Sequence, residues 1–122
     1  MKTTANCPCL GKSLPRLLRP GIMTILAKKK SYGYEIAQTL SGLLMFEYRT
    51  PDTAGIYRAL KEMQDEGLVI SQWQSTETGP AKKLFEITSD GMKCLNNWKE
   101  TLDDYQKAID ELLHIIKSNK LG

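Results

Sequence analysis

The stretch GIYRALKEMQDEGLV, residues 55–69, predicts a single helix that ends at Gly67. Its apolar residues Ile56, Leu60 and Met63 follow the spacing i, i+4, i+7, which places them on one side of a helix. A glycine after the last apolar residue is typical of a helix C-terminus. This side of the helix is therefore expected to face a core.

The opposite side of the same helix carries Tyr57, Arg58 and Lys61 close to the helix start, which Asp52 or Thr53 is suited to cap. A helix that enters the major groove of DNA reads base edges with its N-terminal residues, and arginine can hydrogen-bond guanine at two positions. If this helix stood alone, the better interpretation of these three residues would be that they are ordinary solvated side chains. The prediction of DNA binding therefore needs further evidence from the rest of the chain.

Two further helices are expected before residues 55–69. Apolar residues at helical spacing indicate a first helix whose firm part runs over about residues 20–28. A polar run of lysines follows, and Ser31 is expected to cap a second helix. That second helix is expected to end near residues 41–42, where a serine precedes a glycine.

After the helix of residues 55–69, the apolar period changes from 3.6 to 2. LVISQWQS (68–75) and KKLFEIT (82–88) alternate in the manner of strands, and the segment TETGPA between them contains a Gly-Pro turn. The pattern predicts a two-stranded hairpin with a polar tip. Lys82 and Lys83 lie at the start of its second strand, where they could hold the DNA backbone.

The last predicted helix runs from about Ser89 to Ser118 and carries a heptad seam. A helix of about 29 residues is about 43 Å long, more than a domain of this size needs. We therefore expect part of the seam to pack on a second copy of the chain, although the N-terminal helix could also cover it. The predicted dimer interface consists of Leu95, Trp98, Leu102, Tyr105, Ile109, Leu112 and Ile116.

The order helix, helix, capped helix and hairpin is that of a winged helix-turn-helix. The predicted fold class is mostly α with a small β-hairpin: a winged helix-turn-helix plus a long C-terminal dimerisation helix. Residues 1–12 lack an apolar period and are expected to form a flexible N-terminal extension. Residues 13–88 are expected to form the DNA-binding domain, and residues 89–122 the C-terminal dimerisation helix.

The charge of the chain is unevenly distributed. The net charge is +3, but residues 1–34 carry seven basic and no acidic residues, which leaves −4 on residues 35–122. A basic end suggests an anionic partner such as nucleic acid, and a solvated basic tail is an equally good interpretation. The apolar stretch 21–27 is too short to span a membrane, and no signal peptide is indicated. We expect a cytoplasmic protein with no membrane partner.

Other candidate sites carry weaker signals. Cys7, Cys9 and Cys94 could form a thiolate metal site or a redox switch, but incidental cysteines are the simpler interpretation, and no metal or cofactor is expected. Trp98 is interpreted first as core filling. Alternatively, two symmetry-related Trp98 rings could flank a dimer cavity and stack a flat aromatic effector. No paired nucleophile and base and no glycine-rich phosphate loop occur, so an enzyme is not expected.

Four segments together resemble the PadR-type transcriptional regulators. They are YGYEIAQTL (32–40), GIYRALKEMQDEGLV (55–69), GPAKKLFEITSDG (79–91) and the tryptophan-bearing last helix. The resemblance covers about residues 14–116, and its specificity lies in the combination of segments. It implies a dimeric winged-helix repressor that is joined through its C-terminal helices and released by a small effector.

The resemblance also implies roles for single residues. By position, Tyr34 matches a tyrosine of the second helix that approaches a phosphate. Tyr57 and Arg58 match a pair on the recognition helix, and Lys83 matches a basic residue of the wing. Tyr32 stands where the family often has a histidine.

The predicted function is that of a sequence-specific DNA-binding transcriptional regulator, a homodimeric repressor that binds a roughly palindromic operator and is released by a small effector. Two alternatives remain open: a regulator that senses a metal or thiol redox state through its cysteines, and a winged-helix protein-interaction module that does not bind DNA. The predicted DNA contacts are Tyr34, Thr53, Ala54, Gly55, Tyr57, Arg58, Lys61, Lys82 and Lys83. The lysines at 28–30 could add contacts to phosphates.

Overall fold

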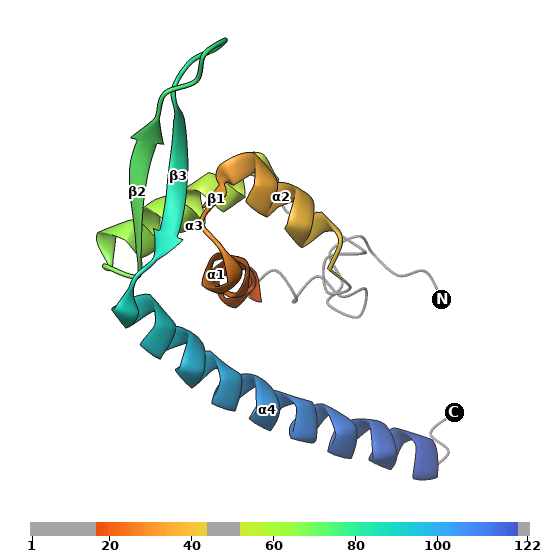
Figure 1. The fold of residues 1–122 in the computed structure, drawn as a ribbon. Coiled ribbons are helices and arrows are strands. Elements are labelled where there is room, and N and C mark those ends of the chain that lie inside the picture. Colours follow the sequence, from red (N-terminus) through yellow and green to blue (C-terminus); the bar gives the residue numbers. More distant parts are fainter. Residues whose placement is uncertain (1–16, 44–51, 120–122) are drawn as a thin grey trace.

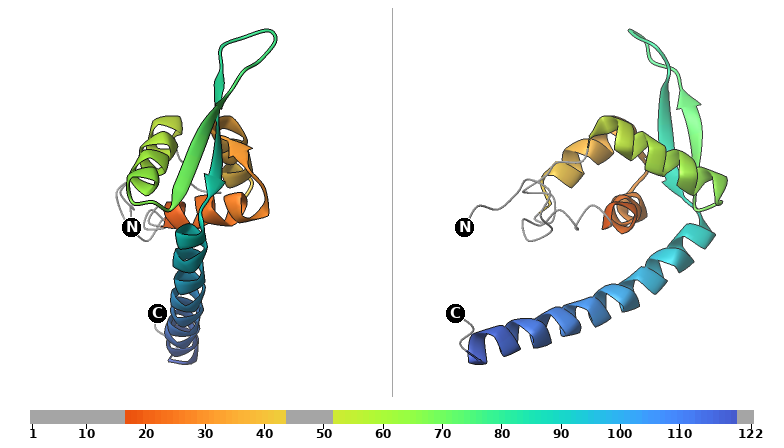
Figure 2. Two further views of the ribbon diagram at one scale, coloured as in Figure 1. Left: turned by 60° about the vertical axis from the view of Figure 1, so that its left-hand side comes forward. Right: turned by 180° about the vertical axis from the view of Figure 1, so that it is seen from behind.

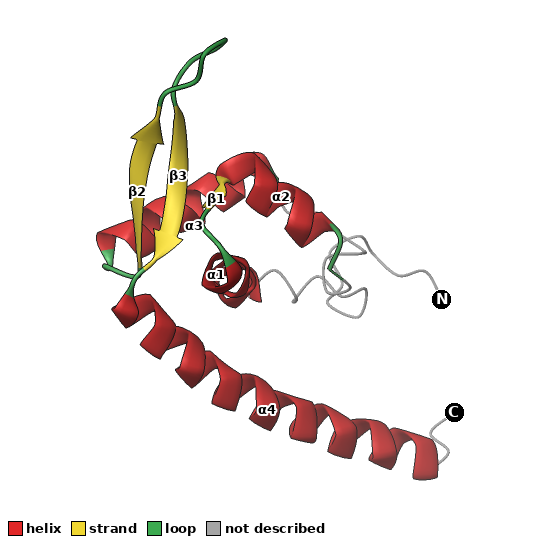
Figure 3. Ribbon diagram, viewed as in Figure 1, coloured by secondary structure: helices red, strands yellow, loops and turns green. Residues whose placement is uncertain are grey.

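The computed structural model describes residues 17–43 and 52–119, in which four helices stand beside a small antiparallel sheet (Figure 1 and Figure 3). The predicted fold class, mostly α with a winged helix-turn-helix and a long last helix, is confirmed. Figure 1 labels its elements, which are α1 (Leu18–Lys28), β1 (Ser31–Tyr32), α2 (Gly33–Ser41), α3 (Thr53–Asp65), β2 (Val69–Gln74), β3 (Lys82–Ile87) and α4 (Ser89–Ser118).

The core lies between α1, α2, α3 and the lower part of the sheet. The side of α3 that was expected to face it does so, with Ile56, Leu60 and Met63 almost fully buried. Each such aliphatic side chain contributes about 1.5–3 kcal/mol when it is removed from water. The remaining core residues are Ile22, Met23, Leu26, Ile36, Leu40, Ala59, Val69 and Phe85.

The sheet has three strands, one more than the predicted hairpin, in the order β1-β3-β2. The extra strand contains Ser31, so the prediction that Ser31 caps α2 is wrong. Ser31 is buried opposite Phe85 of β3, and its hydroxyl donates to the carbonyl of Lys29 (3.1 Å). The residue at the N-cap is Tyr32, whose N–H donates to the Glu35 carboxylate (2.8 Å). Pairing with β3 thus holds the start of α2 against the hairpin.

The predicted ends of α3 are confirmed. Asp52, rather than Thr53, caps the helix, because its carboxylate accepts a hydrogen bond from the N–H of Gly55 (2.7 Å). After the helix, Gly67 adopts a φ of 78°, a left-handed conformation that glycine reaches without steric cost. The reversal at Gly67 allows the N–H of Leu68 to donate to a carbonyl of the last helical turn before the chain enters β2.

Thr88 connects the hairpin to α4. Its hydroxyl donates to the carbonyl of Gly67 (2.7 Å) and accepts from the N–H of Gly91 (3.0 Å), so one side chain caps α4 and binds the turn after α3. Gly91 is buried against the carbonyl of Leu68, where a β-carbon would collide with the backbone. These contacts fix the direction in which α4 leaves the hairpin.

The two halves of α4 have different surroundings. The first half passes beneath α1, and Leu95 and Trp98 are half-buried against the core of their own chain (Figure 1). The second half projects away from the other described elements in both views of Figure 2. Its seam residues are exposed there, with Ile109 at 62% and Leu112 at 60%. None of the helices in residues 17–43 and 52–119 combines the length and the hydropathy of a membrane span.

Candidate nucleic-acid interface

The outer side of α3 presents the three residues that the sequence singled out. Tyr57, Arg58 and Lys61 are all exposed. The Lys61 ammonium lies 3.8 Å from the carboxylate of Asp65, one turn later on the same helix. An exposed ion pair at this spacing stabilises a helix by only about 0.3–0.5 kcal/mol. A phosphate could therefore replace Asp65 as the partner of Lys61 at little cost in stability. Arg58 takes part in none of the ion pairs formed within residues 17–43 and 52–119.

The predicted contacts at the start of α3 do not all have the same structural role. Thr53 and Ala54 are exposed in the first turn. Gly55 was predicted as a DNA contact, but it is half-buried and faces its own cap: a β-carbon there would lie 2.6 Å from Oδ1 of Asp52. The need for glycine at this position is therefore explained by the cap of α3.

Tyr34 lies at the start of α2 and links that helix to the hairpin. Its ring stacks on Tyr32, with centroids 5.9 Å apart and planes at 4°. The ammonium of Lys82 lies over the Tyr34 ring, 4.9 Å from its centroid. A cation in this position is attracted by the ring quadrupole. Half of the surface of Tyr34 remains exposed beside this lysine.

Tyr57 also contacts the start of α2. Its ring lies across Gly33, so closely that a β-carbon at Gly33 would overlap the phenol. Tyr57 remains 44% exposed. The structure thus brings Tyr34 and Tyr57, which are distant in sequence, to one place on the surface.

A cavity of about 340 Å³ lies where α2, α3 and the hairpin meet. It brings four of the predicted contacts together with four other residues. Arg58 and Lys61 do not line it. The lining residues are Tyr32, Gly33, Tyr34, Tyr57, Trp73, Ala81, Lys82 and Lys83.

Trp73 is the main addition that the structure makes to the predicted site. It lies opposite Lys83 in the hairpin, is 67% exposed, and has the Lys83 ammonium 5.4 Å from its ring centroid. The alternating pattern placed Trp73 on the same strand face as Val69, which is buried. What the pattern did not give is where along the strand the core ends: Val69 is buried, and Trp73, four residues further on, is exposed.

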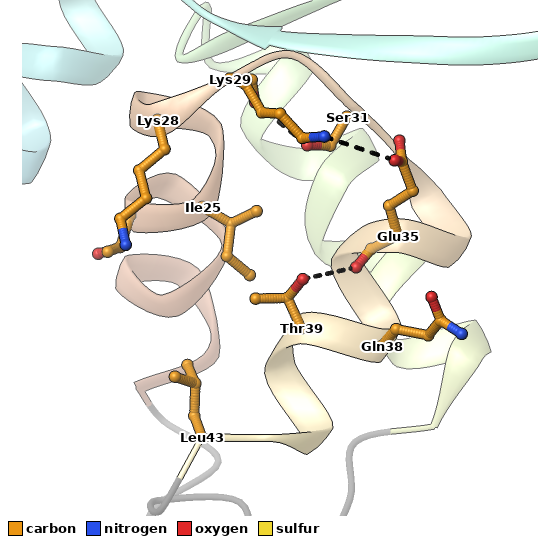
Figure 4. Close-up of a pocket in the computed structure, with 9 residues that line it drawn as sticks. Ile25, Lys28, Lys29, Ser31, Glu35, Gln38, Thr39 and Leu43 are labelled. Carbon is orange, nitrogen blue, oxygen red and sulfur yellow. Dashed lines mark hydrogen bonds and ion pairs between the residues drawn. The ribbon is translucent and has the colours of Figure 1, made fainter.

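Two of the three lysines at 28–30 form partly exposed ion pairs within the chain. The Lys29 ammonium lies 3.9 Å from the Glu35 carboxylate, and the Lys30 ammonium lies 3.8 Å from the Glu86 carboxylate. Lys28 and Lys29 border a second cavity, of about 350 Å³, between α1 and α2 (Figure 4). In Figure 4, Ile25 points into the space between the two helices. Trp98, proposed from the sequence to flank an effector cavity, does not line this one.

The cysteine-based alternative involves one residue of the described core. Cys94 is half-buried and packs against the core cluster. Cys7 and Cys9 lie outside the described residues, as does the predicted N-terminal extension. In residues 17–43 and 52–119, no group of three or more histidine, cysteine or acidic side chains could hold a metal ion.

The family model of the PadR-like transcriptional regulators matches residues 22–97. The chain belongs to the PadR-like family. The resemblance inferred from its motifs is therefore confirmed, and so is the expectation that it is a regulator and not an enzyme. Comparison with curated proteins found no match.

Solved structures of PadR-like and related regulators share the fold. A candidate transcriptional regulator from Thermoplasma acidophilum is 31% identical with a TM-score of 0.70, covering 84% of this chain and 96% of that one. A PadR-like regulator from Bacillus cereus is 25% identical with a TM-score of 0.71 at the same coverage. PadR of Bacillus subtilis, solved in complex with operator DNA, is 26% identical with a TM-score of 0.61, covering 68% of this chain and 47% of that one.

Proposed function

We propose that this PadR-like regulator is a cytoplasmic, homodimeric repressor that binds a roughly palindromic DNA operator and is released by a small effector. The observation that carries the proposal is the arrangement of α3, whose exposed side presents Arg58 and Lys61 next to a hairpin that bears two lysines. The likeness to the Bacillus subtilis PadR that was solved with its operator supports the same use of the fold.

Each part of this surface suits one part of DNA. Arg58 is suited to a guanine edge, because its fork of N–H donors can bind two acceptors at once. Lys61 lies one turn further along α3 and suits a backbone phosphate. Lys82 and Lys83 reach the backbone from the hairpin, here called the wing, and the Tyr34 hydroxyl can donate to a phosphate. Arg58 would therefore determine which DNA sequence is bound, and the other four contacts would position the protein on the DNA backbone.

The homodimer is proposed from the exposed half of α4. A stripe of apolar side chains continues from Trp98, which packs on its own chain, to residues that nothing in the described chain covers. Large exposed apolar patches mark interaction surfaces. A second copy of α4 would cover the stripe and place two α3 helices on one face of DNA, about one helical turn apart. The exposed stripe consists of Leu102, Tyr105, Ile109, Leu112, Leu113, Ile115 and Ile116.

The first test is duplex binding, measured by fluorescence anisotropy against salt concentration. The probe is the DNA upstream of the protein's own gene, and the control is a scrambled duplex of equal length. We expect binding that prefers the upstream DNA and weakens steeply between about 50 and 200 mM salt, because each neutralised phosphate releases counterions. Absence of binding to either duplex at low salt, with reductant and chelator present, would contradict the proposal and favour a protein-interaction module.

A further inference from the structure

The exposure of Trp73 is not explained by folding. Val69 on the same strand face closes the core, and Ser71 donates a hydrogen bond to Gln64 of α3 (3.0 Å). Trp73 lies further along the hairpin, where 67% of its surface is exposed. The Lys83 ammonium over the ring leaves much of the indole open to an apolar partner.

The surroundings of Trp73 favour an anion. The cavity that it borders is lined by three tyrosines and by Lys82 and Lys83, and within residues 17–43 and 52–119 no acidic residue lines it. Each of the two ammonium groups lies over an aromatic ring, one over Tyr34 and the other over Trp73. A cation held by a ring quadrupole keeps its charge available to a second partner.

The size and composition of the cavity point to a small unit rather than a base pair. Its volume of about 340 Å³ is at the low end of the range for small-ligand pockets. Its lining combines hydroxyl donors and ammonium groups with one large apolar ring. A free phosphate would use the cations but leave the indole without a partner. A deoxyribose joined to its phosphate offers an apolar C–H edge and a negative charge side by side.

We propose that this cavity is a socket for one sugar–phosphate unit of the DNA backbone, with the Trp73 indole against the deoxyribose and the Lys82 and Lys83 ammonium groups at the phosphate. In the socket, Tyr32 is a positioning residue, because its ring stacks on Tyr34. The inference rests on the proposed function and adds an apolar contact from the wing to the phosphate contacts already described.

The test separates the apolar contact from the charged ones. Trp73→Ala should weaken duplex binding about five- to tenfold, in the range of one aromatic stacking contact, and leave the salt slope unchanged. Lys83→Gln should lower the slope by about one, because one phosphate contact is lost. Trp73→Phe should retain most of the affinity. Ile70→Ala is the matched control, since Ile70 is an exposed apolar residue on the opposite face of the same strand.

A second measurement reads the position of Trp73 directly. The chain has two tryptophans, so in a Trp98→Phe background Trp73 is the only one. Its fluorescence should change on addition of duplex and saturate together with the anisotropy, once circular dichroism has shown that the variant is folded. The socket is overturned if wild type binds duplex and Trp73→Ala binds equally well, or if the Trp98→Phe variant binds duplex while its Trp73 emission stays constant. If wild type binds no duplex, the proposed function itself fails.

Discussion

The phenol ring of Tyr57 lies across Gly33, so that this side chain of α3 contacts the first turn of α2. No other residue fits at position 33 without moving Tyr57, because any β-carbon would overlap the ring. Gly33 therefore sets the position of a tyrosine that is 24 residues away in sequence and that lines the cavity between α2, α3 and the wing.

Gly33→Ala should displace the Tyr57 ring and weaken duplex binding. We expect a three- to tenfold rise in Kd, about the value of one hydrogen bond, and a loss of stability of about 1–3 kcal/mol from overpacking. Gly42→Ala is the control, because a β-carbon at Gly42 meets only ordinary contact at 3.5 Å. Anisotropy and urea unfolding measure the two effects. Wild-type affinity in Gly33→Ala would show that Tyr57 contributes no contact.

Arg58→Ala should cost about 1–3 kcal/mol of binding to the operator and reduce the preference for operator over random duplex. The reason is that Arg58 is exposed on α3 and takes part in none of the ion pairs of the described residues. Lys61→Ala is the comparison: it should weaken binding to all duplexes equally and lower the salt slope by about one. Competition anisotropy with both duplexes measures the preference. Unchanged discrimination in Arg58→Ala would remove the arginine from base recognition.

The double substitution Ile109→Glu and Leu112→Glu should abolish the dimer without unfolding the chain. Both side chains are already about 60% exposed in the single chain, so only a partner loses contacts when they become charged. Sedimentation velocity would show a monomer, and circular dichroism an intact helical content. Glu111→Lys, which alters charge on the other side of α4, is the control. A dimer that survives the double change would place the interface elsewhere.

Gly67→Ala should destabilise the fold by about 1–2 kcal/mol, because position 67 has a φ of 78° that disfavours a β-carbon. Gly67→Asn should cost less, since asparagine tolerates this region better than alanine. Gly79→Ala in the hairpin tip is the control, where the nearest contact of a β-carbon is an ordinary 3.6 Å. Urea unfolding at fixed protein concentration measures the difference. Equal stability of the two alanine variants would contradict the turn's proposed role.

Local signals in the sequence predicted most elements of the fold. The apolar spacing of α3, its start at residue 52 or 53 and its end at Gly67, the change of period at the hairpin and the start of the last helix near Ser89 were all confirmed. These features depend on contacts within one or two turns of the chain. Nearby residues therefore suffice to specify these features, and they can be predicted from short stretches of sequence.

The sequence by itself determined the helices, the hairpin and the exposed basic residues of α3. Only the tertiary structure decided that Ser31 is in a strand, that Tyr57 rests on Gly33, and that Trp73 extends past the core. It also divided the α4 seam into a half that packs on its own chain and a half that is exposed. Each of these depends on contacts between residues far apart in the chain, and periodicity and capping carry no information about which distant segments meet.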